Sequence, residues 1–307
     1  MKRKLSALLV LICGPLLSHA QDFPPFYPPD LSYERDGAKT AEYDGQSITF
    51  LDRGDGSPIL PFMYVGGGYP YWQTLIEAAS DDYRVLAPDG HSFTLPQLKA
   101  LIEYADAGPA DIVTHSAASW IAIYFAQRHP ELVNSLILLE PAYGPDLESV
   151  QAAAEVFVTS CELTDQPADI IGSCLLLNSM SGPGYAERIA AVYLAPINDS
   201  QANMPIAEVI RRSDLPTAGA ELAEQGWQFP YPPICDISQS LNVPILVIRG
   251  SISTESNRIG LDAHEACMPD HETVVIDGTT HFAHFEKPDE FNAVVLDFIA
   301  RHGNEER

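Results

Sequence analysis

Short apolar runs alternate along the chain with segments in which apolar residues recur at helical spacing. The pattern predicts strands at residues 41–43, 47–51, 59–65, 83–87, 112–113, 135–139, 243–249 and 273–276. It predicts helices at 71–79, 95–104, 289–300 and in the segment that follows residue 118. Strands that alternate with helices are typical of an α/β domain whose mostly parallel sheet is covered on both faces.

The alternation stops near residue 142 and returns at residue 243. The intervening segment has mainly helical character and is interrupted by proline and glycine. Open α/β sheets bind ligands beyond the carboxyl ends of their strands, so we interpret this segment as a cap inserted above those ends. The predicted core therefore comprises residues 41–141 and 241–307, with a mainly helical cap at 142–240.

Residues 1–20 have the features of a secretory signal. A basic region, Lys2 to Lys4, precedes an apolar stretch at 5–17, and small residues then precede a cleavage point. The apolar stretch is too short to cross a bilayer, so we expect a cleaved signal and no membrane anchor. The mature chain would begin near Gln21 in the periplasm or outside the cell, with a proline-rich extended arm at 21–40.

The chain is strongly acidic. It contains 17 basic and 42 acidic residues, a formal net charge of −25, and loss of the three basic signal residues leaves 14 against 42, or −28. This balance argues against nucleic acid and anionic membrane surfaces as partners. Two explanations stay open: a solvated acidic surface that keeps an exported protein soluble, or adaptation to salty surroundings.

Four cysteines follow residue 20: Cys161, Cys174, Cys235 and Cys267. An even set in an exported protein suggests two disulfides, with three possible connectivities. Proximity along the chain favours Cys161–Cys174 and Cys235–Cys267. No Cys-x-x-Cys pair occurs, and zinc is therefore not expected.

A second group of metal-binding residue types, His264, Glu265 and His271, lacks a ligand spacing. We interpret these three residues as part of a solvated helix and loop. No metal or other cofactor is predicted.

Ser116 lies between small residues at a predicted strand-to-helix turn. Thr114 and Ala118 stand two positions before and after it, where a sharp turn admits only small side chains. Such a turn exposes the serine hydroxyl and directs the amide of Ala117 toward the same reacting atom. Ser92 has similar neighbours, but no apolar strand runs directly into it. Ser116 is therefore the predicted nucleophile.

A serine nucleophile needs a base, an orienting carboxylate and donors for the developing oxyanion. His281 follows the last predicted strand and precedes the final helix, on the side of the sheet where Ser116 is expected. His284 is the local alternative and is expected to lie behind it. The amide of Gly67, within three glycines after a buried strand, would join that of Ala117 as an oxyanion donor.

The motifs Thr114-His115-Ser116-Ala117-Ala118, Val65-Gly66-Gly67-Gly68, Glu140-Pro141 and Thr280-His281-Phe282 together resemble the α/β-hydrolase superfamily. The resemblance covers residues 41–303 and implies an eight-stranded, mostly parallel sheet, flanking helices and a Ser-His-acid triad. Two positions depart from the family pattern. Val65 stands where these enzymes usually carry His, and Ser253 stands where they usually carry the aspartate.

Some members of the superfamily carry the acid at the end of the strand that follows the nucleophile helix. Glu140 occupies that position, and its Leu-Leu-Glu-Pro setting resembles a group of secreted bacterial esterases. A carboxylate that ends an apolar strand needs a partner, and an imidazole would serve. Glu140 is the predicted acid, and Glu255 is the alternative.

The predicted function is hydrolysis of carboxylic esters of small molecules through an acyl-enzyme on Ser116. A lipase, amidase or lactonase with the same triad, or a non-catalytic binding module, are the alternatives. Tyr69, Trp72, His115 and Tyr143 could line the acyl pocket, although core packing of the aromatic rings is an equal alternative. The sequence indicates neither the ester nor the oligomeric state.

Overall fold

The computed structural model describes residues 38–63, 69–88, 95–116, 118–141, 234–252, 255–268 and 270–302. The predicted signal, most of the predicted arm and nearly all of the predicted cap lie outside the described residues. So do the three glycines at 66–68, Ser92, and the predicted Cys161–Cys174 pair. None of the described helices is long and apolar enough to cross a membrane.

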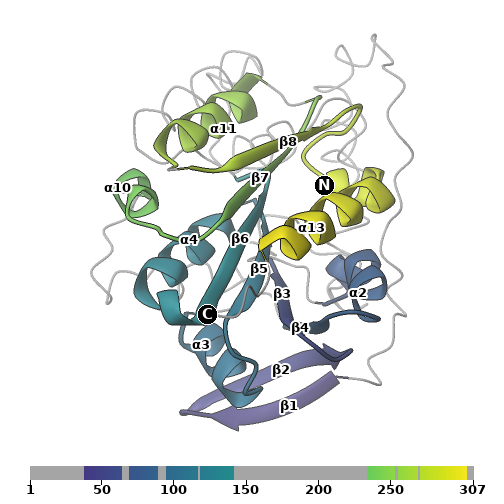
Figure 1. The fold of residues 1–307 in the computed structure, drawn as a ribbon, viewed down its shortest axis with the longest axis vertical. Coiled ribbons are helices and arrows are strands. Elements are labelled where there is room, and N and C mark those ends of the chain that lie inside the picture. Colours follow the sequence, from purple (N-terminus) through teal and green to yellow (C-terminus); the bar gives the residue numbers. More distant parts are fainter. Residues whose placement is uncertain are drawn as a thin grey trace, which may run out of the picture.

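Eight strands form one sheet in the order β1-β2-β4-β3-β5-β6-β7-β8 (Figure 1). The first two strands form an antiparallel hairpin, and β2 also pairs antiparallel with β4. All other neighbouring strands are parallel. The strands are β1 Ala38–Tyr43, β2 Gln46–Arg53, β3 Pro58–Phe62, β4 Arg84–Pro88, β5 Ala110–His115, β6 Val133–Leu139, β7 Ile245–Gly250 and β8 Glu272–Ile276.

Helices follow most of the parallel strands. They are η3 Tyr69–Trp72, α2 Gln73–Ala79, α3 Leu95–Tyr104, α4 Ala118–Arg128, η4 Pro130–Leu132, α10 Ile234–Gln239, α11 Glu255–Cys267, α12 Ala283–Glu286 and α13 Pro288–His302. These elements confirm the predicted alternation, with bounds that differ from the predictions by a few residues.

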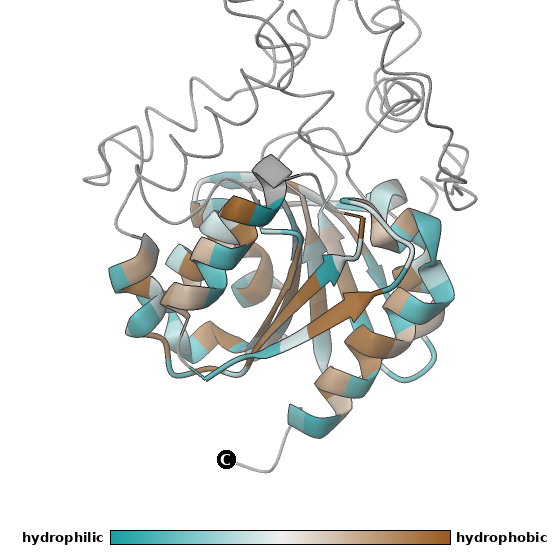
Figure 2. Cartoon of the chain, turned by 90° about the horizontal axis from the view of Figure 1, so that it is seen from above, coloured by the Kyte–Doolittle hydropathy of each residue, from teal (hydrophilic) through white to brown (hydrophobic). Residues whose placement is uncertain are grey.

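The parallel strands are apolar on both faces because helices cover both faces. Side chains alternate across a strand, so Leu136 and Leu138 of β6 enter one core with α3 and α4, whereas Ile137 enters the other with α2 and α13. Figure 1 shows α3 and α4 on one side of the sheet and α2 and α13 on the other. In Figure 2 the apolar strands lie between these two helical layers.

The last helix packs through the predicted apolar stripe. Phe291, Val295, Phe298 and Ile299 of α13 are fully buried in the second core, and Val294 is partly buried against it. His281 lies in the loop between β8 and α12, and α13 follows α12 directly, so this packing anchors the C-terminal side of the segment that carries His281.

A disulfide joins α10 to the end of α11. It links Cys235 to Cys267, as their proximity in the sequence predicted. Ile237 of α10 also packs against the core that contains α4. Residues 234–239 fall within the predicted cap range, but they pack on the hydrolase core.

The expected solvation of His264 is wrong. Its side chain is fully buried, and Trp120 Nε1 donates a hydrogen bond to His264 Nε2 over 3.1 Å. Trp120 belongs to α4 and His264 to α11, so contact between these two helices removes the imidazole from solvent. Glu265, the next residue of α11, instead pairs with Arg249 at 2.9 Å.

Candidate active site

Ser116 lies in a left-handed turn between β5 and α4. Its φ is 58°, a conformation that costs free energy for any residue with a Cβ. Two hydrogen bonds hold the turn, since the Ser116 amide donates to Leu139 O over 2.9 Å and Ser119 N donates to Ser116 O over 3.1 Å. This is the backbone expected of a nucleophile at a sharp strand-to-helix turn.

Glu140 has the same unusual backbone at the end of the neighbouring strand. Its φ is 46°, and its amide donates to Ile248 O over 2.8 Å. Among the described residues, the other non-glycine residues with positive φ are Asp44 and Asp106, which lie in turns. The buried members of this group are therefore the predicted nucleophile and the predicted acid, at adjacent strand ends.

The Glu140 carboxylate is completely buried and accepts two hydrogen bonds. Gly250 N donates to Oε1 over 2.6 Å, and His281 Nδ1 lies 3.3 Å from Oε2. An ionised carboxylate only accepts, so the Nδ1 atom must carry the proton. In the neutral imidazole the lone pair is then on Nε2, where a general base acting on serine needs it.

His281 is buried beside the strand that leads to Ser116. The rings of His281 and His115 are 4.5 Å apart between centroids. The Nε2 atom of His281 has no hydrogen-bond partner among the described residues. The arrangement brings a buried, carboxylate-bonded imidazole next to the strained serine turn.

Gly250 allows the loop that precedes His281 to approach the end of β7. A Cβ atom at this position would lie 2.4 Å from Thr280 O and 2.5 Å from Thr279 O, which is too close for any side chain. The same glycine donates its amide to Glu140. One backbone position thus adjoins both Glu140 and the loop that carries His281.

His115 is a buried support for the site, although the sequence suggested it as a pocket residue. Its Nε2 lies 2.7 Å from His281 O, and its Nδ1 lies 2.5 Å from the Tyr71 hydroxyl. Burial, first, and then the nearby imidazoles of His281 and His284 hold the pKa of His115 well below its usual value. A neutral His115 is therefore expected near pH 7.

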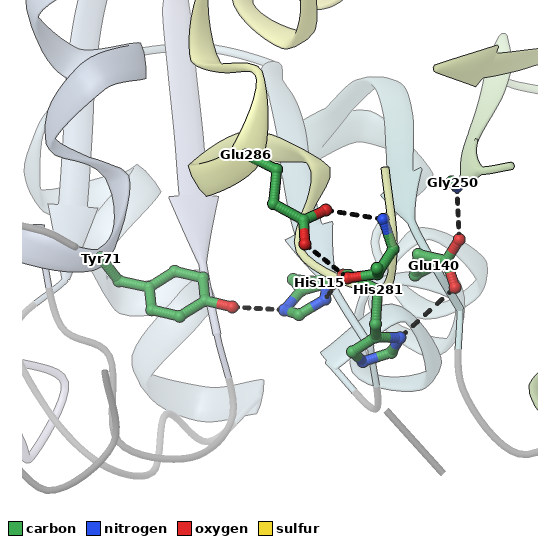
Figure 3. A network of polar contacts seen from close by, with 7 residues as sticks. Tyr71, His115, Glu140, Gly250, His281 and Glu286 are labelled. Atoms are coloured by element: carbon green, nitrogen blue, oxygen red, sulfur yellow. Dashed lines mark hydrogen bonds and ion pairs between the residues drawn. The ribbon is translucent and has the colours of Figure 1, made fainter. Parts of the chain in front are cut away.

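Glu286 contacts the same loop from α12. Its two carboxylate oxygens accept hydrogen bonds from Thr280 N, over 2.6 Å, and from Thr280 Oγ1, over 2.8 Å. Figure 3 shows this carboxylate, the Tyr71–His115 pair and Glu140 arranged around His281.

His284 is buried next to His115, and neither of its ring nitrogens has a hydrogen-bond partner among the described residues. The ring packs between Tyr71, Trp72 and Phe285. Burial and the nearby His281 keep the pKa of His284 well below its usual value. This histidine is therefore a neutral member of the core.

Tyr69 and Trp72 are also fully buried. Trp72 stacks on Phe291 of the last helix and contacts His284 with its ring tilted, which is the core packing that the sequence left open. The remaining predicted site residues, Gly67, Ala117 and Tyr143, lie outside the described residues. Glu255 begins α11, but its side chain is likewise not described.

Three supporting residues were not predicted: Tyr71, Gly250 and Glu286. No periodicity or spacing marks them, because each acts through a contact between segments distant in the sequence or through a buried backbone group. Glu286 carries no distinctive signal either, because Lys287, Asp289 and Glu290 in the same segment are also charged.

The sequence matches the α/β hydrolase family over residues 59–294, and the chain belongs to this family. The match includes the serine turn, Glu140 and His281, together with the segment of the predicted cap. A comparison with curated proteins finds no match.

Solved structures share the fold at low sequence identity. A thermophilic esterase from Thermogutta terrifontis superposes with a TM-score of 0.60 and 18% identity over 87% of this chain and 99% of its own. The carboxylesterase CesB from Bacillus subtilis gives 0.57 and 15%, over 88% and 94%. The epoxide hydrolase CorEH gives 0.55 and 18%, over 86% and 98%. Relatives of such different activity show that fold alone does not define the reaction.

Proposed function

We propose that this protein is a serine hydrolase that cleaves carboxylic esters of small molecules. The observation that carries the proposal is the contact between the buried Glu140 carboxylate and His281 Nδ1, beside the strained backbone of Ser116. The contact orients the imidazole with its basic nitrogen available, which is the arrangement that activates a serine hydroxyl.

In the proposed reaction, Ser116 Oγ attacks the acyl carbon while His281 Nε2 takes the hydroxyl proton. Glu140 stabilises the imidazolium that forms, and the amides of Gly67 and Ala117 would stabilise the oxyanion. The imidazolium then gives its proton to the departing alkoxide, leaving an acyl-enzyme. Water attacks this ester and loses a proton to His281, and the imidazolium then returns this proton to Ser116 Oγ as the bond to the acyl carbon breaks and the carboxylic acid leaves.

An ester substrate is supported by the nucleophile and by the relatives. Two of the similar structures are described as an esterase and a carboxylesterase. The epoxide hydrolase relative has the same fold, but members of the superfamily that open epoxides use an aspartate nucleophile. Ser116 stands at the nucleophile position here, which favours acyl transfer.

A fluorophosphonate probe on the purified full chain tests the proposal. We expect covalent labelling of the wild type and its loss in Ser116→Ala. The matched control is Ser92→Ala, which removes the other serine in a similar sequence setting and should label like the wild type. A wild type that does not react with the probe would instead favour a non-catalytic binding module.

A series of p-nitrophenyl esters of increasing acyl length then tests the reaction itself. We expect turnover that is lost in Ser116→Ala and that peaks at one range of chain lengths. Turnover of p-nitroanilides but not of esters would assign the site to an amidase.

We also propose that the chain is exported and that residues 1–20 are removed. The support is the basic and apolar pattern of that segment and the Cys235–Cys267 disulfide, which persists in oxidising compartments. Expression with the native N-terminus should yield periplasmic or extracellular protein that begins near Gln21 by intact mass. Cytoplasmic protein that retains Met1 would contradict this.

A further inference from the structure

The hydrogen bond from His281 to Glu140 is longer than those that hold the surrounding backbone. The Nδ1–Oε2 distance is 3.3 Å, whereas the Thr280 amide and the His281 carbonyl make bonds of 2.6 and 2.7 Å to other groups. Hydrogen bonds weaken as they lengthen, so the carboxylate contact by itself positions the imidazole poorly. The main chain at 280–281 is held more tightly than the side chain.

The first support is the pair formed by Tyr71 and His115. A carbonyl can only accept, so His115 Nε2 must donate its proton to His281 O. The Nδ1 atom of a neutral His115 is then an acceptor, and the Tyr71 hydroxyl donates to it. The tyrosine therefore selects the tautomer in which His115 can hold the His281 carbonyl.

The second support is Glu286, which contacts the residue before His281. Its carboxylate accepts from both the amide and the hydroxyl of Thr280, the residue before His281. Glu286 is buried, and such a carboxylate holds its donors firmly because no water competes for them.

We propose that Tyr71, His115 and Glu286 are positioning residues that clamp the main chain of Thr280 and His281 from two sides. None of the three has a role in the reaction proposed above, and the inference rests on that proposed function. The clamp sets where the imidazole lies between Glu140 and the serine, so that a weak side-chain contact is enough to orient it. Small displacements of a catalytic base are costly, since a misplacement of about 1 Å can slow a reaction by roughly a hundredfold.

Tyr71→Phe removes only the hydroxyl and is the first test. We expect kcat on a p-nitrophenyl ester to fall by roughly ten- to a hundredfold, with KM and melting temperature close to wild type. Tyr124→Phe is the matched control, because it deletes a hydroxyl from another buried tyrosine, on α4, that bonds Arg128. It should leave kcat unchanged.

Glu286 supplies a second, independent test by rescue. Glu286→Ala removes both acceptors and should lower kcat at least as much as Tyr71→Phe. Glu286→Gln keeps an amide oxygen that can accept from Thr280 N and should recover a large part of the loss. Equal activity of the Ala and Gln variants, or wild-type turnover in Glu286→Ala, contradicts the clamp.

Nuclear magnetic resonance of the imidazole ¹⁵N nuclei tests the clamp without reference to turnover. Wild-type His115 should be the neutral Nε2–H tautomer across pH 6–8, and Tyr71→Phe should mix the two tautomers. A wild-type Nδ1–H tautomer or a charged His115 overturns the clamp even if the enzyme is active. If the fluorophosphonate probe does not label the protein but His115 shows the expected tautomer, the proposed function is refuted and the clamp still holds.

Discussion

Ser116 and Glu140 share a backbone conformation that neither residue type favours. The φ values of 58° and 46° place both in the left-handed region, which costs roughly 1–2 kcal/mol for a residue with a Cβ. The two residues end adjacent parallel strands, and the hydrogen bonds to Leu139 O and Ile248 O hold them there. Strain that is kept at buried, polar strand ends is consistent with a catalytic role for both side chains.

Glu140→Gln tests the acid. The glutamine keeps an oxygen for the Gly250 amide, but a neutral side chain cannot stabilise an imidazolium, and its NH₂ group can force the wrong tautomer on His281. We expect kcat to fall by about a thousandfold or more with a smaller change in KM. Ester turnover and the melting temperature should be measured together.

Glu255→Gln is the matched control, and it should retain near-normal turnover. The opposite result, with normal activity in Glu140→Gln and a large loss in Glu255→Gln, would transfer the acid to the position after β7.

His115 and His284 link stability to pH. Their pKa values are lowered in the folded protein, mainly by burial, and return to about 6.5 on unfolding. Above pH 6.5 neither state binds the proton, and the two residues have no effect on the pH dependence. Below it the unfolded chain binds protons that the folded chain does not, so the free energy of unfolding declines as the pH falls, by up to about 1.4 kcal/mol per pH unit for each imidazole.

His284→Leu isolates one of these two contributions. Among the described residues the imidazole has no hydrogen-bond partner to lose, so the substitution should keep or raise stability at pH 8. In urea unfolding at pH 8, 6.5 and 5.5, the variant should lose less stability on acidification than the wild type, because one proton-binding site has gone. Identical slopes for the two proteins would refute a depressed pKa at His284.

At the scale of elements, the site depends on how the β8–α12 loop meets the end of β7. Gly250 is the contact point, because a Cβ there would lie within 2.5 Å of the carbonyls of Thr279 and Thr280. The carboxyl ends of β5 and β6 carry Ser116 and Glu140, and the approach of the loop to the end of β7 brings His281 to Glu140. The carboxyl ends of parallel strands lie at one edge of the sheet, and the close approach of the β8–α12 loop adds His281 to this edge.

Gly250→Ala should push this loop away from β7. We expect a decrease of about 1–3 kcal/mol in the free energy of unfolding, as overpacking causes, and a loss of kcat because His281 moves from Glu140. Gly45→Ala is the control, since Gly45 has a φ of 75° but open space around it in the β1–β2 turn. The Gly45→Ala substitution should lower the free energy of unfolding by roughly 1–2 kcal/mol through backbone strain and leave kcat unchanged. An equal loss of kcat in both variants would show that reduced stability alone causes the loss.

At the scale of the whole molecule, the Cys235–Cys267 disulfide connects the end of the long central segment to the second half of the core. It closes a loop with a sequence separation of 32 residues that includes β7 and α11. The disulfide stabilises the folded protein by lowering the conformational entropy of the unfolded chain within this loop.

Replacing both Cys235 and Cys267 with alanine should lower the free energy of unfolding by about 3–4 kcal/mol, from the loop length. Urea unfolding of the wild type and the double variant, without reductant, measures this difference. Any further loss when dithiothreitol is added to the double variant would report the predicted Cys161–Cys174 pair. A double variant as stable as the wild type would show that the α10–α11 contact does not depend on the bond.

The hydropathy pattern determined the sheet, its helices and the apolar stripe of the last helix. Buried apolar side chains recur with a period of two residues in strands and of 3.6 residues in helices, and both periods can be read from the sequence. It also indicated Ser116, His281 and Glu140, since a small-residue turn, a loop after the last strand and a charged end to an apolar strand are local features. His264 shows where this reasoning stops, because α11 is polar enough to suggest solvent and its contact with α4 cannot be read from either helix alone.

The sequence by itself thus determined the class of fold and the residue types at three strand ends. Only the tertiary structure decided which carboxylate meets which imidazole: Glu140 contacts His281 across a separation of 141 residues, and Glu286 holds the preceding peptide instead. It also placed Tyr71, His115 and Gly250 in contacts around His281, the proposed base. These pairings depend on strand order, register and close backbone approach, which arise when the sheet assembles and have no counterpart in local sequence.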